Sequence, residues 1–429
     1  MMFWFFNRAN LQNIFQLSIV NYQLFRTFAP MMIQLPKEFI HTTKALMGEE
    51  RFERYLHSFE EDTPVSIRLN PAKMEEGRWK LDEMVPWCRN AFYLDKRPNF
   101  TFDPLFHAGC YYVQEAASMF LDEVLRQLSI INYQLSVDMC AAPGGKSTLL
   151  RAALPADCVL YSNEPMQKRA SILLENVTKW GYKNHHVTNL YPRDYRKSKM
   201  KFDLILCDVP CSGEGMFRKD EATIKEWSPQ NVEKCWQLQR EIVSDAWACL
   251  NDGGILIYST CTFNTKENEE NVRWILSEFD AEVVSIETKP EWNITGSLMQ
   301  GFDEPVYRFI PGITRSEGLF MCVLRKGGER SKRDDVRGKM DRLKTMTSDF
   351  NFQPSAVKVE LSYAQALAYL RREALTLPSD TPLGIVEVCF MGHPLGLMKN
   401  IGNRANNLYP KEWRIKTTHV PQEYEPVLW

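Results

Sequence analysis

The chain has 429 residues, of which 44% are apolar and 25% are charged, and its formal net charge is −2. This length predicts roughly two to four domains, and the composition excludes both a disordered chain and a protein that is basic throughout. Any nucleic-acid-binding surface must therefore be local and balanced by acidic residues elsewhere.

The first segment, residues 1–30, is rich in Phe, Asn and Gln and carries few charges. Polar residues interrupt its apolar runs, so the segment fits neither a signal peptide nor a membrane span. We interpret it as an extension outside the folded protein, with Met31 or Met32 as the natural start. We expect no association with a membrane.

Residues 31–104 are expected to form a small α/β region. A helical pattern spans Pro36–Phe59, and an alternating apolar pattern spans Pro64–Pro71. Prolines bound the second pattern, and proline interrupts strand pairing, so this pattern predicts one short strand.

Residues 105–327 alternate apolar runs with helical patterns. The strand-like runs are Leu135–Met139, Val159–Asn163, Val187–Leu190, Phe202–Val209 and Gly254–Thr260, and the helical patterns are Gln167–Trp180 and Val232–Leu250. We expect Asn251–Gly254 to end the second helix as a turn. The alternation predicts a parallel, doubly wound sheet, whose ligands bind at the carboxyl ends of its strands.

The last part of the chain is basic. Residues 328–350 form a charged stretch that is typical of a solvated linker, and residues 351–429 are expected to form a further small domain. From Arg325 to the end of the chain, Lys and Arg outnumber Asp and Glu, although the whole chain is slightly acidic.

One segment carries a glycine-rich turn between a strand and a helix. It consists of Cys140, Ala141, Ala142, Pro143, Gly144, Gly145 and Lys146. A phosphate-binding P-loop would need a glycine where Cys140 stands, which argues against a nucleotide triphosphatase. The next strand ends in Glu164, and an acid at that position can bind two ribose hydroxyls. The turn and the acid therefore indicate an adenosine-bearing cofactor. The residues alone leave NAD and S-adenosylmethionine open, although the glycine spacing weakens NAD.

The chain has 11 cysteines and no Cys-x-x-Cys pair, which indicates free thiols in a reducing, cytoplasmic protein without a structural metal. Cys211 and Cys261 each follow a strand and sit in a polar turn. The cysteines inside apolar runs are expected to be core residues; they are Cys158, Cys207, Cys249, Cys322 and Cys389.

Two thiols at one sheet edge suit a particular reaction. Carbon 5 of cytosine is a poor nucleophile, but a thiolate that adds to carbon 6 makes it enamine-like, so that it can attack a methyl group. An acid beside the ring N3 assists this addition. A second cysteine can help the first one leave.

At these residues the chain resembles the Nop/Sun-type RNA cytosine-C5 methyltransferases. The matching motifs are Asp138–Lys146, Asp208–Gly213 and Tyr258–Thr262, and further similarity to the bacterial branch that modifies small-subunit ribosomal RNA (the F-type enzyme) lies at Arg68–Pro71, Tyr111–Ala116, Gly215–Lys219 and Leu395–Pro410. The resemblance implies a Rossmann-like class I methyltransferase domain of the α/β class. It also implies a small RNA-binding N-terminal α/β region and a PUA-like α+β RNA-binding domain at the C-terminus.

The resemblance also implies roles for single residues. Cys261 is the nucleophile, Cys211 assists release, and Asp208 contacts both the target base and the methyl end of S-adenosylmethionine. Glu164 holds the ribose, and the segment from Cys140 to Lys146 wraps the methionine part. The family has an acid for the adenine near Leu190 and Tyr191; here Asn189, Asp194 or a backbone carbonyl would have to take its place.

Two groups of residues are expected to contact RNA. After the Pro-Cys turn come Phe217, Arg218 and Lys219, which could grip the strand near a flipped base. The basic residues of the last domain suit the RNA backbone, with Tyr409 and Trp413 as stacking surfaces; they are Lys399, Arg404, Lys411, Arg414 and Lys416.

Together these patterns predict a monomeric methyltransferase that uses S-adenosylmethionine to form 5-methylcytosine in ribosomal RNA of the small subunit. The same chemistry on transfer RNA is one alternative. A ribosome-assembly factor that binds RNA without catalysis is another, although the presence of both Cys211 and Cys261 argues against it. Enzymes that methylate DNA attack from the Pro-Cys motif, so the Thr-Cys cysteine here favours RNA.

Overall fold

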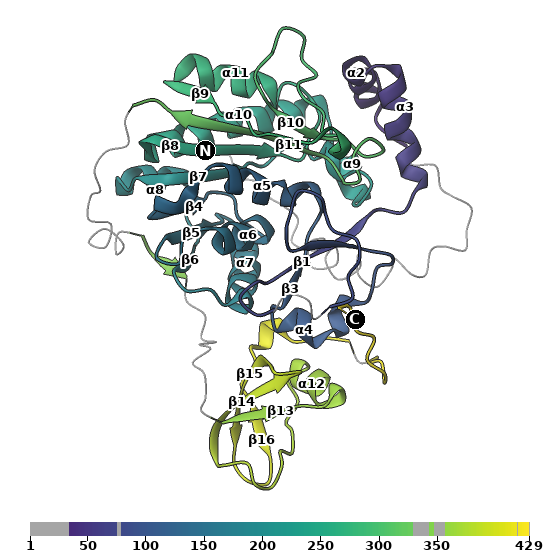
Figure 1. Ribbon diagram of the computed structural model, residues 1–429, viewed down its shortest axis with the longest axis vertical. Coiled ribbons are helices and arrows are strands. Elements are labelled where there is room, and N and C mark those ends of the chain that lie inside the picture. The colour runs from purple at the N-terminus through teal and green to yellow at the C-terminus, as the bar shows by residue number, and fades with distance from the viewer. Residues whose placement is uncertain (1–33, 75–78, 329–342, 347–356, 418, 429) are drawn as a thin grey trace.

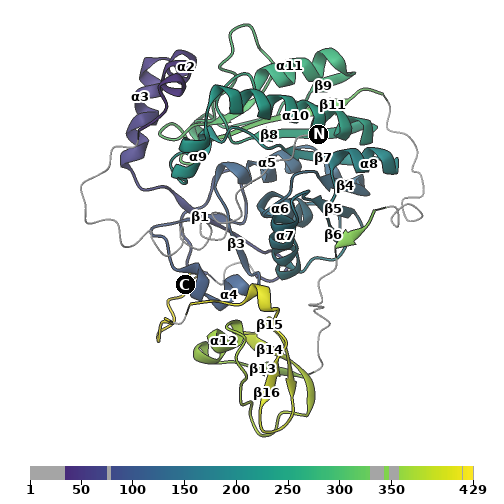
Figure 2. The same cartoon turned by 180° about the vertical axis from the view of Figure 1, so that it is seen from behind.

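The computed structural model describes residues 34–74, 79–328, 343–346, 357–417 and 419–428 (Figure 1). The predicted extension over residues 1–30 lies outside this range, as does most of the predicted linker. The described part contains three sheets, and Figures 1 and 2 show the largest of them in the upper part of the molecule and the C-terminal sheet at the bottom.

The central sheet has the order β10-β11-β8-β7-β4-β5-β6-β12, and β9 pairs with β11. The five strands β4 to β8 are parallel to one another, whereas β9 to β12 pair antiparallel with their neighbours. The doubly wound parallel sheet is therefore confirmed, with antiparallel strands added at both edges. The strands are β4 Leu135–Asp138, β5 Val159–Asn163, β6 His185–Thr188, β7 Phe202–Asp208, β8 Leu250–Thr260, β9 Ala281–Val283, β10 Tyr307–Phe309, β11 Leu319–Lys326 and β12 Thr345–Met346.

Helices cover both faces of this sheet. Along β7, Leu204 and Leu206 pack into one apolar core with α5 and α6, while Ile205 and Cys207 pack into another with α10. This alternation follows from the two-residue period of a strand and explains why β7 is apolar throughout. The helices of this domain are α5 Phe120–Gln127, α6 Gly145–Ala153, α7 Gln167–Trp180, α8 Pro192–Ser198, α9 Glu221–Glu226, α10 Pro229–Cys249 and α11 Glu269–Glu278, with short 3-10 turns η3 Ala117–Met119, η4 Ile130–Asn132, η5 Glu214–Met216 and η6 Pro290–Trp292.

The second helix ends where expected, since α10 stops at Cys249. The expected turn over Asn251–Gly254 was wrong, because these four residues lie inside β8. They form an irregularity in the pairing with β7, because Phe202 pairs with Leu250 whereas Leu204 pairs with Ile255. Gly253 adopts a φ of +69°, which favours glycine and lets the strand absorb the extra residues.

The N-terminal region contains a helical hairpin and an antiparallel sheet of order β2-β1-β3. The single helical pattern predicted over Pro36–Phe59 is broken at Gly48, whose φ is +78°. The predicted strand is present as β1. The elements are α2 Lys37–Met47, α3 Glu49–His57, η1 Ser58–Glu60, β1 Val65–Leu69, β2 Ala91–Leu94, η2 Phe100–Phe102, α4 Pro104–His107 and β3 Tyr111–Val113.

The C-terminal domain has a sheet of order β13-β14-β15-β16 and one α-helix among its described residues. It shares an apolar core with the N-terminal sheet. Tyr363 donates a hydrogen bond to the carbonyl of Phe102 at 3.1 Å, and Tyr424 donates one to Asp103 at 3.1 Å. The elements are β13 Lys358–Glu360, α12 Tyr363–Leu370, β14 Gly384–Phe390, β15 His393–Asn400, β16 Ala405–Asn407 and η8 Lys411–Trp413.

Candidate active site

The glycine-rich turn lies at the carboxyl end of β4, in the middle of the parallel sheet. Asp138 ends the strand, and α6 begins at Gly145. Gly144 adopts a φ of +117°, a conformation that side chains disfavour, so the turn requires glycine there. The Ser147 hydroxyl donates to the Asp138 carboxylate at 2.5 Å, which fixes the turn to the start of α6. Burial raises the pKa of Asp138 to about 7.

Glu164 follows β5, the neighbouring strand, and its side chain is buried. One carboxylate oxygen accepts the backbone N–H of Met166 at 2.9 Å, and the other lies 3.2 Å from the guanidinium of Arg169. Burial raises the pKa of Glu164. The glycine turn and this acid lie at the ends of the adjacent strands β4 and β5. This arrangement suits an adenosine-bearing cofactor, whose ribose hydroxyls the acid can bind.

The residues predicted to contact the adenine already form hydrogen bonds within the protein. The Asn189 amide donates to the carbonyls of Glu164 and Pro165 at 2.7 and 3.0 Å. The Asp194 carboxylate accepts the N–H of Tyr191 at 3.1 Å and caps α8. The N–H of Leu190 donates to Asn163. The adenine contact remains a prediction.

Asp208 ends β7 beside the glycine turn. Its carboxylate accepts hydrogen bonds from the Lys146 ammonium at 2.9 Å and from the Ser259 hydroxyl at 2.7 Å. Burial lowers the pKa of Lys146, but the charge and the hydrogen bond of Asp208 outweigh it, so the pKa is raised. The structure thus joins Lys146, from the glycine-rich turn, to the acid predicted to contact the base.

The two predicted cysteines meet at the ends of β7 and β8. The Sγ atoms of Cys211 and Cys261 lie 3.1 Å apart, and the N–H of Cys261 points at the Cys211 sulfur at 3.3 Å. Both are half-buried, whereas the five cysteines assigned to the core are all buried, as expected. The hydrogen bond to Cys261, together with burial, raises the pKa of Cys211 well above its usual value. Cys211 is therefore protonated at neutral pH.

Two buried carboxylates beside these thiols were missed in the sequence. Glu214 and Glu267 accept backbone N–H groups of the loops that carry Cys261 and Cys211, respectively. The sequence does show that each acid stands a few residues after one of the two cysteines. An acid in a loop is usually solvated, so this position alone did not single them out.

The predicted RNA-contacting residues divide into exposed and buried ones. Lys219 and all five basic residues predicted in the C-terminal domain are exposed; these five are Lys399, Arg404, Lys411, Arg414 and Lys416. The Arg218 side chain is only 4% exposed and lies 3.6 Å from Glu317, so it is not on an open loop. Tyr409 is 1% exposed and packs against Tyr369, so it is a core residue and cannot stack on a base as predicted.

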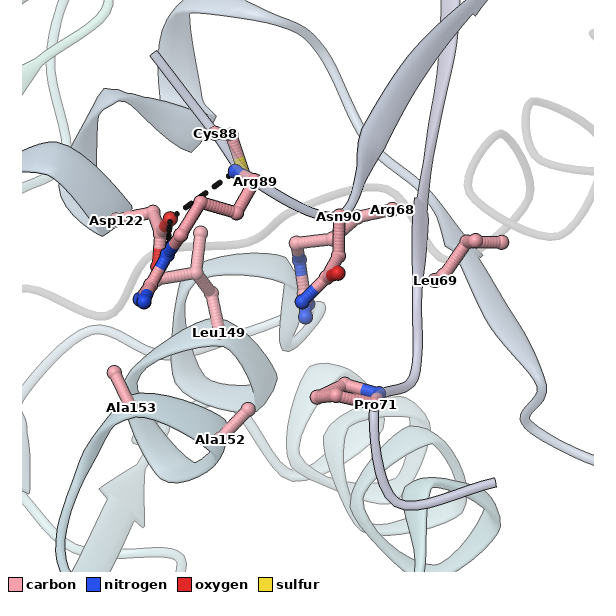
Figure 3. Close-up of a pocket in the computed structure, with 10 residues that line it drawn as sticks. All are labelled: Arg68, Leu69, Pro71, Cys88, Arg89, Asn90, Asp122, Leu149, Ala152 and Ala153. Carbon is pink, nitrogen blue, oxygen red and sulfur yellow. Dashed lines mark hydrogen bonds and ion pairs between the residues drawn. The ribbon is translucent and has the colours of Figure 1, made fainter. Parts of the chain in front are cut away.

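A small cavity of about 50 Å³ lies between the N-terminal sheet and α6 (Figure 3). None of the predicted site residues is among those that line it. The buried guanidinium of Arg68, at its edge, donates to Gln114 at 2.9 Å, to Thr148 at 2.7 Å and to the carbonyl of Gly145 at 3.2 Å. Arg68 therefore links the N-terminal sheet to α6, the helix that follows the glycine-rich turn.

The described residues contain neither a metal-binding group nor a membrane-spanning helix. No group of three or more His, Cys, Asp or Glu side chains in this part of the chain could hold a metal ion. No helix among the same residues is both long enough and apolar enough to cross a bilayer.

Three family models match the chain in order. They describe the N-terminal domain of 16S rRNA methyltransferase RsmF over residues 35–116, the 16S rRNA methyltransferase RsmB/F over residues 126–325, and the methyltransferase RsmF PUA domain over residues 356–415. The chain is thus similar to this family over its N-terminal, central and C-terminal parts.

Among curated relatives, the Ribosomal RNA small subunit methyltransferase F of Pectobacterium atrosepticum is 31% identical, over 68% of this chain and 63% of its own length. The protein of the same name from Vibrio atlanticus is 30% identical, over 82% of this chain and 75% of its own length. The chain thus spans less than two thirds of the Pectobacterium relative.

Solved structures show the same fold. A methyltransferase homologue from Pyrococcus horikoshii is 26% identical with a TM-score of 0.58, covering 70% of this chain and 100% of that one. NSun6 from the same organism, solved with SFG, has a TM-score of 0.58 at 20% identity, covering the same shares of both chains. The Rossmann-like methyltransferase fold is confirmed, and the chain belongs to the RsmB/F family of 16S rRNA methyltransferases, with the N-terminal and PUA domains of its RsmF branch.

Proposed function

We propose that this protein transfers a methyl group from S-adenosylmethionine to carbon 5 of a cytidine in small-subunit ribosomal RNA. The observation that carries the proposal is the pair of thiols, Cys211 and Cys261, 3.1 Å apart at the ends of adjacent parallel strands. The names of the relatives, which are small-subunit ribosomal RNA methyltransferases, support this class of substrate. We also propose a cytoplasmic location, on the ground that the relatives are named as ribosomal RNA methyltransferases.

The residues that would hold S-adenosylmethionine are those of the glycine turn together with Glu164. Glu164 would accept hydrogen bonds from the ribose hydroxyls, and the backbone from Cys140 to Gly145 would approach the methionine part closely. When bound, S-adenosylmethionine supplies an electrophilic methyl group. The related NSun6 structure contains SFG, an analogue of S-adenosylmethionine, which supports this choice of cofactor.

Cys261 acts as the nucleophile. Its sulfur forms a bond to carbon 6 of the cytosine, and the electron pair of the carbon 5–carbon 6 double bond becomes available at carbon 5. Asp208 lies near Cys261, because its carboxylate accepts a hydrogen bond from Ser259, which stands two residues before Cys261. A carboxyl group at this position can bond the N3 and N4 edge of the base and stabilise the charge that develops in the ring. Lys146 holds Asp208 in place.

Cys211 assists the last step. Once carbon 5 carries the methyl group, its proton passes to water, the double bond re-forms, and the bond between carbon 6 and the Cys261 sulfur breaks. Cys261 leaves as a thiolate. Cys211 is protonated because its pKa is raised, so its S–H can donate to that thiolate and stabilise it.

RNA binding is assigned to the N-terminal region and to the exposed basic residues of the C-terminal domain. Lys399 and Arg404 flank the turn between β15 and β16, and Lys411 and Arg414 lie on and just after η8. Such side chains bind phosphates without reading sequence, so they would hold the RNA while the catalytic domain takes one base. Lys219, exposed after the Pro-Cys turn, would contact the strand nearer to that base.

The test is methyl transfer from labelled S-adenosylmethionine to three substrates: naked small-subunit RNA, assembled small subunits and a transfer RNA pool. We expect label in one cytidine of the ribosomal RNA, identified as 5-methylcytosine by bisulfite sequencing, and none with Cys261→Ala. Label in transfer RNA instead would show that the substrate is transfer RNA and not ribosomal RNA. Tight RNA binding without any methylation would favour an assembly factor.

A further inference from the structure

Two buried carboxylates form hydrogen bonds from one thiol-bearing loop to the other. Glu214 stands three residues after Cys211 and is 2% exposed. One of its oxygens accepts the backbone N–H groups of Phe263 and Asn264, at 2.8 and 2.9 Å. The acid on the Cys211 loop thus holds the backbone of the Cys261 loop.

The reverse contact is made by Glu267, six residues after Cys261 and fully buried. One of its oxygens accepts the backbone N–H of Ser212 at 3.0 Å, together with the Gln239 amide at 2.7 Å. The other oxygen accepts the amide of Asn264 at 2.8 Å. The acid on the Cys261 loop thus holds the residue next to Cys211.

Three further bonds close the arrangement. The Asn264 amide also donates to Glu214 at 3.1 Å, so it lies between the two carboxylates. The hydroxyls of Ser212 and Thr262 are 2.9 Å apart, and the N–H of Gly215 donates to the carbonyl of Cys261 at 2.8 Å. We call Glu214 and Glu267, with their crossed backbone bonds, the carboxylate clasp.

We infer that the carboxylate clasp positions the Cys211 thiol against the Cys261 sulfur, so that Cys211 can assist release of the methylated base. The inference rests on the proposed function. Burying an acid is unfavourable unless several donors surround it, and here two acids are buried where apolar residues would pack at lower cost. Their bonds join the two thiol-bearing loops at backbone atoms, which fixes the distance between the loops.

Glu267 offers the sharper test of the two. Glutamine has nearly the same size but only one acceptor oxygen, so its NH2 group faces either the donors of Ser212 and Gln239 or the amide of Asn264, and Glu267→Gln weakens the link between the two loops. The attack by Cys261 depends on the other loop, which Glu214 still holds. Loss of Glu267 should therefore slow release more than attack.

The experiment uses the full chain, S-adenosylmethionine and small-subunit RNA, and follows covalent protein–RNA adducts on denaturing gels. Four proteins are compared: the parent, Glu267→Gln, Cys211→Ala and the double variant. Glu270→Gln, a nearby half-buried acid, is the control. We expect Glu267→Gln to accumulate adduct and to lower kcat about tenfold or more, with the KM for S-adenosylmethionine within about twofold of the parent.

The double variant separates positioning from a general structural effect. If Glu267 acts through Cys211, Glu267→Gln adds no further slowing of release when Cys211 is already alanine. Equal slowing in both backgrounds, or parent-like release by Glu267→Gln, overturns the inference. If Glu267→Gln does not fold, Glu267→Asp is used; its carboxylate is one methylene shorter, so release slower than that of the parent is expected, and parent-like release overturns the inference.

RNA that contains 5-fluorocytidine separates the two proposals. If the parent traps this RNA and Glu267→Gln traps it at a similar rate, attack by Cys261 is intact and the defect lies in release. Loss of trapping in Glu267→Gln contradicts the inference, because attack would then be affected. Failure of the parent itself to trap contradicts the proposed function instead.

Discussion

Cys211 and Cys261 face each other with their sulfur atoms 3.1 Å apart, although 50 residues separate them in the chain. The cause is the topology of the sheet. Strands β7 and β8 are parallel neighbours, and Asp208 pairs with Ser259. Both strands therefore leave the sheet at the same edge, and each reaches its cysteine within three residues of that pair. The site is a product of strand order and register.

The first prediction concerns Glu164. Its replacement by glutamine removes the charged acceptor that we propose for the ribose, and hydrogen bonds to charged groups contribute about 1.5–3 kcal/mol. We expect the Kd for S-adenosylmethionine to rise about 10- to 100-fold, measured by calorimetry. Asp157→Asn, at an exposed position before β5, should leave the Kd unchanged. A Kd for Glu164→Gln equal to that of the parent would show that this acid does not contribute to cofactor binding.

A second prediction concerns stability. Arg308 and Glu269 form an ion pair that is completely buried, and Arg308 also donates to the carbonyl of Phe263 at 2.7 Å. Glu269→Gln leaves the buried guanidinium without its counter-charge, which costs about 3–5 kcal/mol, equivalent to a fall in Tm of about 10 °C. The exposed pair of Arg325 and Glu282 is the comparison; Glu282→Gln should change stability by less than about 1 kcal/mol. Similar Tm values for the two variants would contradict this account.

The third prediction is a pH dependence. Burial raises the pKa of Asp138 to about 7, whereas an unfolded aspartate titrates near its ordinary value of about 3.9. The folded protein thus binds a proton that the unfolded chain releases, and stability falls as the pH rises from about 4 to about 7. Asp138→Asn stays neutral. The Tm of the parent should therefore fall relative to that of Asp138→Asn between about pH 5 and about pH 8. A constant difference would show that Asp138 is ionised throughout.

The fourth prediction concerns the C-terminal domain. Replacing Lys411 or Arg414 by alanine should weaken RNA binding for all sequences alike, and should lower the slope of log K against log salt by about one for each phosphate that is no longer neutralised. Filter binding at several salt concentrations measures this slope. Lys358→Ala, in the same domain, is the control because the Lys358 ammonium lies 3.7 Å from Glu387. An unchanged slope in the Lys411 and Arg414 variants would place the RNA elsewhere.

The sequence predicts the parts of the site that depend on strand ends. A strand followed by a polar turn is visible locally, so Cys211, Cys261, Glu164 and the glycine turn could be located in advance. Contacts between distant loops could not. Arg218 is buried because Glu317, about a hundred residues later, packs beside it. Glu214 and Glu267 are buried because each finds its donors on the other cysteine's loop, and no local pattern encodes that pairing.

The most direct test of the central claim is covalent trapping of small-subunit RNA substituted with 5-fluorocytidine, in the presence of S-adenosylmethionine. The parent and Cys211→Ala should form protein–RNA adducts that survive denaturing gels, and Cys261→Ala should form none. That result would establish Cys261 as the nucleophile of a cytosine-C5 methyltransferase. Trapping that depends on Cys211 instead would exchange the two roles, and absence of trapping by the parent, with cofactor binding intact, would contradict the proposed reaction.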